Sequence, residues 1–77
     1  TFLNKTSIMV WRNDFTKREK EISDLVSLGL TNDAIGKKLN ISTPTVKTHL
    51  RNIYAKSGIH DRANLAIRVL NSKNLKF

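Results

Sequence analysis

Helix-capping residues recur along the chain from Thr16 onward, and they divide it into short helices. Thr16 and Glu19 have the spacing of a capping box, in which the hydroxyl and the carboxylate each accept a hydrogen bond from the other residue's backbone N–H. Further residues that favour helix starts or left-handed helix ends follow at short intervals: Gly29, Thr31, Asn40, Ser42, Gly58 and Asp61. This spacing predicts an all-α fold, a compact bundle of four helices joined by loops of two to four residues.

The residues before the first cap differ from the rest of the chain. Ile8-Met9-Val10-Trp11 is a short apolar run with no helical period. We therefore expect residues 1–14 to form an N-terminal arm or linker and residues 15–77 to form the folded domain. The run around Ile8–Trp11 either links that domain to another one or packs on the helices. Because 77 residues leave no room for a phosphoacceptor or ligand-binding domain, we expect any regulatory domain to lie outside this chain.

Positive charge is concentrated in the second half of the chain. The 77 residues contain 14 Lys and Arg against 6 Asp and Glu, which gives a formal net charge of +8. From Ala34 to the end, nine basic residues are accompanied by a single acid, Asp61. A surface charged in this way attracts phosphates, so the expected partner is a polyanion.

The sequence lacks the residue patterns of several classes of function. It has no cysteine, and His49 and His60 are eleven positions apart with no acid at ligand spacing, so neither a metal site nor a cofactor is expected. No nucleophile is paired with an oriented base and no glycine-rich loop could hold a nucleotide, so the chain is not expected to be an enzyme. No apolar run approaches the roughly 20 residues of a membrane span, and no secretory signal is present, which favours a cytoplasmic location.

The third predicted helix, which follows the turn Leu39-Asn40-Ile41-Ser42, has an apolar side and a basic side. The turn and its two helices have the dimensions of a helix-turn-helix. The apolar residues cluster within about a third of the helix circumference: Val46, Leu50, Ile53 and Tyr54. Lys47, Thr48 and Arg51 lie opposite, and residues 42–57 contain no acid. This basic side fits the major groove of DNA, where Lys and Arg donate to guanine and Thr contacts a base edge.

A further flank of this helix carries residues suited to the phosphates that border the groove: Thr45, His49, Asn52 and Lys56. The alternative is a basic helical module that binds RNA or an acidic protein without reading a sequence. RNA-binding modules more often display aromatic side chains on which bases stack, and the outward side of this helix has none. Double-stranded DNA is therefore the favoured partner.

Several segments of the chain resemble the LuxR-type helix-turn-helix family, also called the NarL/FixJ class. They are Phe15–Glu19, Gly29–Asn32, Ile41–Leu50 with its Ser-x-x-Thr-Val-Lys-Thr-His core, Ile53–Lys56 and Asp61–Ala63. The likeness covers residues 15–71. Domains of this family are the DNA-binding output domains of many bacterial response regulators and quorum sensors, so the resemblance implies transcription regulation with the third helix in the major groove.

The resemblance also implies roles for individual residues. Base contacts are expected from Lys47, Thr48 and Arg51. Phosphate contacts are expected from Thr31, Thr45, Asn52 and Lys56. Double-stranded DNA is the implied partner, and RNA polymerase is a further candidate. Gly36 stands where the family usually has Ala, which predicts a loss of about 0.5–1 kcal/mol of helix propensity.

The fourth predicted helix has an apolar arc of roughly 200°, which is wider than a core face needs. The family resemblance implies that this helix forms a two-fold homodimer, and we expect Leu65, Val69 and Leu70 at its interface. A symmetric dimer would read an inverted repeat in DNA. The alternative is that a small domain uses every apolar residue it has in its own core.

Overall fold

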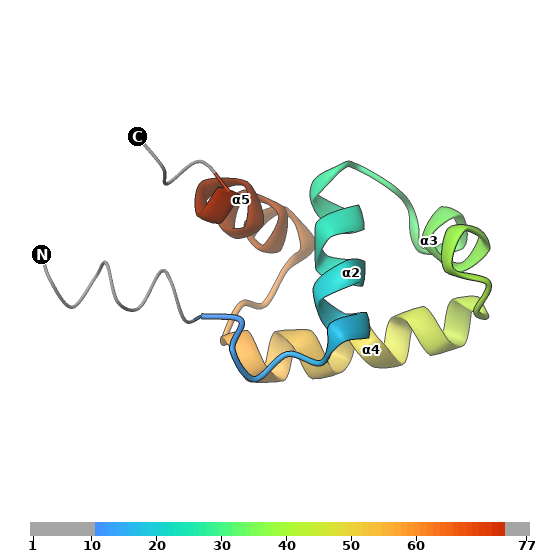
Figure 1. The fold of residues 1–77 in the computed structure, drawn as a ribbon, viewed down its shortest axis with the longest axis horizontal. Helices are drawn as coiled ribbons and strands as arrows, with labels where there is room; N and C mark the ends of the chain where they lie inside the picture. The colour runs from blue at the N-terminus through green and yellow to red at the C-terminus, as the bar shows by residue number, and fades with distance from the viewer. Residues whose placement is uncertain (1–10, 74–77) are drawn as a thin grey trace, which may run out of the picture.

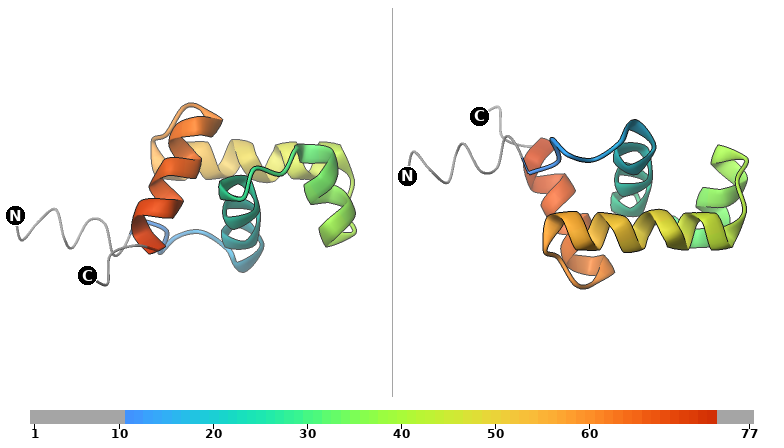
Figure 2. Two further views of the ribbon diagram at one scale, coloured as in Figure 1. Left: turned by 90° about the horizontal axis from the view of Figure 1, so that it is seen from above. Right: turned by 90° about the horizontal axis from the view of Figure 1, so that it is seen from below.

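Four helices and the segment that leads into them make up residues 11–73, the part of the chain that this computed structural model describes. The helices are α2 (Lys17–Ser27), α3 (Asn32–Leu39), α4 (Thr43–Ser57) and α5 (Arg62–Lys73), which confirms the predicted all-α fold. Helix α2 lies between α5 and α3, and all three lie on the same side of α4 (Figures 1 and 2). The opposite side of α4 therefore faces away from the other helices.

The predicted caps begin each helix. The Thr16 hydroxyl accepts a hydrogen bond from the Glu19 N–H at 3.1 Å, and the Glu19 carboxylate accepts one from the Thr16 N–H at 2.9 Å. This capping box satisfies backbone donors that the first turn of α2 would otherwise leave unpaired. The other helices start with side-chain oxygens that accept from the backbone three residues on, contributed by Thr31 for α3, Ser42 for α4 and Asp61 for α5.

Left-handed residues end the first three helices, as the sequence predicts. Gly29 follows α2 with a φ of +88°, and Gly58 follows α4 with a φ of +73°. Asn40 closes α3 with a φ of +59° and donates its N–H to the Gly36 carbonyl. Positive φ values are cheap for Gly and tolerated by Asn. The short loops that they permit bring α3 and α4 together as a helix-turn-helix.

Gly36 has a packing role that its sequence position did not reveal. It is buried, and a Cβ atom at this position would lie 2.7 Å from the Ile41 carbonyl oxygen. The Ile41 N–H donates to the Gly36 carbonyl at 2.9 Å, so the turn passes directly over α3. The glycine therefore costs helix propensity, as the sequence predicts, but this close approach also requires a residue without a side chain at position 36.

The core joins all four helices and the residue before α2. Its buried apolar side chains are Phe15, Ile22, Leu25, Val26, Ile35, Val46, Leu50, Ile53, Leu65 and Val69. Burial of each Val, Leu, Ile or Phe contributes about 1.5–3 kcal/mol to the stability of the fold. Because members come from α2 to α5, the core fixes how α4 sits against the rest of the molecule.

The core corrects part of the expected dimer interface. Leu65 and Val69 are 0% exposed, because they form the side of α5 that packs against the chain's own core. Leu70, the third predicted interface residue, is 42% exposed, and Ile67 on the same helix is 53% exposed. The wide apolar arc of α5 is therefore divided into a buried stripe and an exposed stripe, and only the exposed one is available to a second chain.

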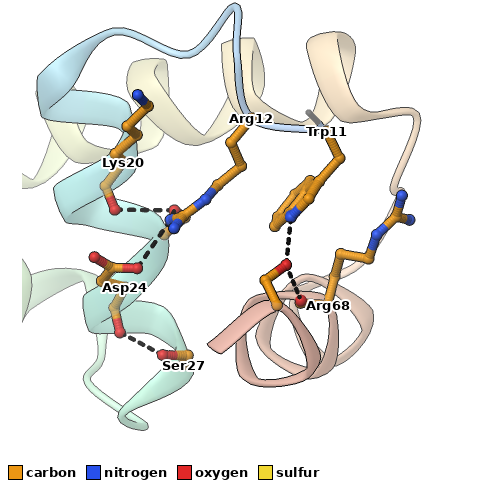
Figure 3. A network of polar contacts seen from close by, with 8 residues as sticks. Trp11, Arg12, Lys20, Asp24, Ser27 and Arg68 are labelled. Carbon is orange, nitrogen blue, oxygen red and sulfur yellow. Dashed lines mark hydrogen bonds and ion pairs between the residues drawn. The ribbon is translucent and has the colours of Figure 1, made fainter. Parts of the chain in front are cut away.

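The segment before α2 packs on the helices from Trp11 onward (Figure 3). The Trp11 ring meets Phe15 edge-on, with 5.5 Å between ring centroids, and its indole N–H donates to the Ser72 hydroxyl of α5. The Arg68 guanidinium of α5 lies 5.1 Å from the same ring. Arg12 donates to the Asp24 carboxylate of α2 at 2.9 Å. Residues 11 and 12 thus belong to the packed unit, whereas the predicted arm residues Ile8–Val10 lie outside the described residues.

Candidate nucleic-acid interface

The open side of α4, which no other helix covers, carries the three residues predicted to contact bases. Lys47, Thr48 and Arg51 are exposed, and Val46 and Leu50 on the opposite side are buried in the core. Within residues 11–73, neither Lys47 nor Arg51 forms an ion pair with an acid. The structure therefore presents two cations and a hydroxyl together on a helix side that no other helix covers.

Thr48 is oriented by its own helix. Its hydroxyl donates to the Pro44 carbonyl at 3.1 Å. The hydroxyl proton is used in this bond, so Thr48 offers an acceptor oxygen and a methyl group on the open side of α4. These groups suit a base amino group or a thymine methyl. Thr48 therefore differs from its two neighbours, which can only donate.

Three of the residues predicted to contact phosphates are exposed: Thr31, Thr45 and Asn52. The Thr31 hydroxyl caps α3, and the Thr45 hydroxyl lies 2.8 Å from that of Ser42 at the start of α4. Thr31 and Thr45 thus place polar groups at the first turns of the two helices of the helix-turn-helix. Backbone N–H groups at such turns are suited to phosphate oxygens.

Lys56, also predicted to contact a phosphate, is paired with a buried acid of α2. Its ammonium lies 2.7 Å from the Glu19 carboxylate, which is 3% exposed, and the Lys56 side chain is 31% exposed. Burial acts to raise the pKa of Glu19, but the hydrogen bonds from Lys56 and the Thr16 backbone, together with the positive charge of Lys56, outweigh it. The pKa of Glu19 is therefore lowered from its ordinary value of 4.5. The pair ties the end of α4 to the start of α2.

The other flank of α4 holds a basic groove that sequence reasoning missed. Its volume is about 290 Å³, and its polar lining comes from three helices. Asn32 contributes from α3, Lys47 and Arg51 from α4, and Arg62 from α5. Arg62 carried no predicted role, because its sequence position gives no sign that α5 begins beside α4. A basic residue directly after the Asp61 cap was the one available signal.

Among residues 11–73, no group of three His, Asp or Glu side chains is arranged to hold a metal ion. Over the same range, no helix has the length and apolar character needed to cross a membrane.

Comparison with known proteins decides the family. Residues 13–69 match the sequence signature of the bacterial regulatory proteins of the luxR family (GerE). The chain belongs to the luxR family. Its four helices are a LuxR-type helix-turn-helix DNA-binding domain of a bacterial transcription regulator, and such a domain is regulatory rather than enzymatic.

Curated relatives of this luxR-family chain are transcription regulators. It is 47% identical over 53 residues to the monoamine regulon transcriptional regulator of Klebsiella aerogenes, which covers 69% of the chain and 23% of that protein. It is 48% identical over 52 residues to the transcriptional regulatory protein LiaR of Bacillus subtilis, covering 68% and 25%. It is 35% identical over 54 residues to the regulator MalT of Yersinia pestis, covering 70% and 6%.

The matched region is a small part of each relative. It spans about a quarter of the first two regulators and 6% of MalT. No solved structure gives a significant match to the chain. The comparisons therefore establish the family of the DNA-binding domain, and the arrangement of its site comes from the residues described above.

Proposed function

We propose that this domain reads a specific double-stranded DNA sequence by placing α4 in the major groove, and that it does so as the DNA-binding part of a longer transcription regulator. Lys47 and Arg51 donate to guanine O6 and N7, and Thr48 contacts a neighbouring base edge. The whole-protein role follows the named roles of relatives such as LiaR.

One observation carries this proposal. The core holds α4 by its apolar side, through Val46, Leu50 and Ile53. The open side carries cations that no acid of residues 11–73 neutralises. Because the core fixes the apolar side of α4 and the basic side is exposed, the helix can enter the major groove without a rearrangement of the fold. Thr31, Thr45 and Asn52 then lie at positions that contact the phosphates of the groove walls.

We propose further that two copies bind an inverted repeat through the exposed stripe of α5. Ile67 and Leu70 are half exposed on this helix, although both are apolar. Burying them against the same residues of a second copy would remove apolar surface from water. Leu70→Asp is expected to weaken self-association on DNA, measured by sedimentation, without lowering the stability of the monomer. Leu65→Ala is the matched core control, and it is expected to lower monomer stability by about 2–4 kcal/mol.

Enrichment of bound sequences from a random duplex pool tests the proposed reading of DNA. The wild-type domain is expected to select one motif, and a dimer is expected to select it twice in inverted orientation. Selection of a single half-site would support base reading and contradict the dimer. If no motif emerges, and duplex DNA competes no better than RNA or an acidic polypeptide at physiological salt, sequence-specific DNA binding is contradicted and the alternative basic module is supported.

A further inference from the structure

We propose that Arg62, at the start of α5, contacts the DNA backbone, and that the groove it shares with Lys47 and Arg51 accepts one phosphate group. This inference rests on the proposed function, since it takes α4 to lie in the major groove. It adds a third helix to the interface, next to the helix-turn-helix formed by α3 and α4. It also assigns a role to Arg62, which is not among the base-contacting and phosphate-contacting residues named above.

Three cations lie around this groove, and no acid of the described residues lines it. Lys47 and Arg51 come from α4 and Arg62 comes from α5, and the groove has a volume of about 290 Å³. Within residues 11–73, none of the three is paired with a carboxylate. Like charges around one opening repel each other, and a bound anion removes that repulsion.

The nearest acids in the sequence are engaged elsewhere. Asp33, next to the groove residue Asn32, lies 3.5 Å from the Lys37 ammonium on the exposed side of α3. Asp61, next to Arg62, caps α5 by accepting from the Asn64 backbone N–H at 2.8 Å and from its side-chain amide at 2.7 Å. Among the described residues, neither carboxylate forms an ion pair with a cation of the groove.

Arg62 is already held in position. One guanidinium nitrogen donates to the Asn32 side-chain oxygen at 2.7 Å, and another donates to the Leu30 carbonyl at 2.7 Å. A guanidinium has five N–H donors, so these two bonds fix its plane and leave donors for a further acceptor. A phosphate contact by Arg62 would thus cost little side-chain entropy, because the rotamer is set in the unbound protein.

The location of the groove favours a phosphate over a base. Its lining includes Leu50 and Tyr54, which belong to the apolar side of α4, as well as Lys47 and Arg51 from the open side. The groove therefore lies at the border between the open side of α4 and the body of the domain. When a helix fills the major groove, the backbone of the DNA runs along this border, and bases lie only in front of the helix.

A salt series with matched variants tests the proposal on a duplex that carries the selected site. Each phosphate contact adds about 0.9 to the magnitude of the slope of log affinity against log salt. Raising the salt from 50 to 200 mM is therefore expected to reduce the affinity of Arg62→Gln about 3.5-fold less than it reduces that of wild type. Arg68→Gln removes the same charge from the side of α5 that faces Trp11, and its slope is expected to match wild type. Equal slopes for wild type and Arg62→Gln would overturn the proposal, as would equal reductions for both Gln variants.

Arg62→Lys separates a phosphate contact from a structural role. Lysine keeps the positive charge and loses the paired donation to Asn32 and Leu30, so the wild-type salt slope is expected even where the melting temperature falls. If Arg62→Lys shows the same shallow slope as Arg62→Gln, the effect comes from misplacement of α3 and the proposal is wrong. A wild-type domain that binds duplex without any salt dependence would instead contradict the proposed DNA binding itself.

Discussion

Lys47 and Lys56 lie nine positions apart on α4, but the structure uses their charges in opposite ways. The Lys56 ammonium sits 2.7 Å from the buried Glu19 carboxylate and joins two helices. Lys47 is exposed, and within residues 11–73 no acid neutralises it. At the end of α4, the charge of Lys56 stabilises the fold. Nearer the start, the charge of Lys47 is available to a partner. A count of basic residues cannot make this distinction, because it depends on where the acids lie in space.

The largest effect is expected on stability, from Lys56→Met. The variant leaves the Glu19 carboxylate buried without its cation, and we expect the free energy of unfolding to fall by about 3 kcal/mol. Urea unfolding followed by the emission of Trp11, the single tryptophan of the chain, measures this change.

Two further variants serve as controls for this loss. The double variant Lys56→Met/Glu19→Gln is expected to recover most of the stability, because the glutamine carries no charge and can still complete the capping box. Lys47→Met is expected to unfold at the wild-type urea concentration. An equal loss for the Lys47 and Lys56 variants would remove the contrast between the two lysines.

The next largest effect is expected on DNA affinity, from Arg51→Ala. Loss of a bidentate contact to guanine costs about 2 kcal/mol, or roughly thirtyfold in affinity, on the selected site. Random duplex should lose much less, and the urea midpoint should not change because Arg51 is exposed. Titrations of both duplexes measure the difference. Equal losses on selected and random DNA would show that Arg51 contacts the backbone instead of a base.

A smaller effect is expected in the pH dependence of stability. The pKa of Glu19 is lowered in the folded state, so its contribution is complete above the unfolded value near 4.5 and is lost as the pH falls toward the folded value. Wild type should therefore lose stability more steeply than Glu19→Gln as the pH falls below about 4.5, and the two curves should run parallel above it. Urea midpoints on both sides of this pH give the comparison, and curves that stay parallel below it would show that the ion pair does not stabilise the fold.

The smallest effect is expected in the salt dependence of DNA binding by Lys56→Met. Glu19 holds the ammonium in the wild-type protein. The slope of log affinity against log salt should therefore equal that of wild type when both proteins are measured well below the melting temperature of the variant. A slope shallower by about one unit would show that Lys56 leaves Glu19 and contacts a phosphate, as its position in the sequence first predicts.

Local features of the chain were predicted well from the sequence. The capping box of Thr16 and Glu19, the left-handed Asn40 and the start of α4 at Ser42 all depend on residues within one helical turn of each other. The basic side of α4 follows from helical periodicity, so the exposure of Lys47 and Arg51 was predicted for the same reason.

Contacts between distant residues were not predicted. Glu19 and Lys56 are 37 positions apart, and Arg62 and Asn32 are 30 positions apart. No local rule pairs them, since each contact requires the core to bring two helices together. For the same reason the apolar arc of α5 could not be divided in advance, and Leu65 was expected at a dimer interface although it is buried in the core.

The sequence by itself therefore determined the helices, the turn between α3 and α4 and the basic side of α4, because these depend on backbone caps and on a period of 3.6 residues. Only the tertiary structure decided which cations are neutralised, which apolar stripe of α5 is exposed, and why Gly36 must pass so close to Ile41. The first two depend on distances between helices, which packing of the shared core sets, and the third depends on the path of the turn that leaves α3.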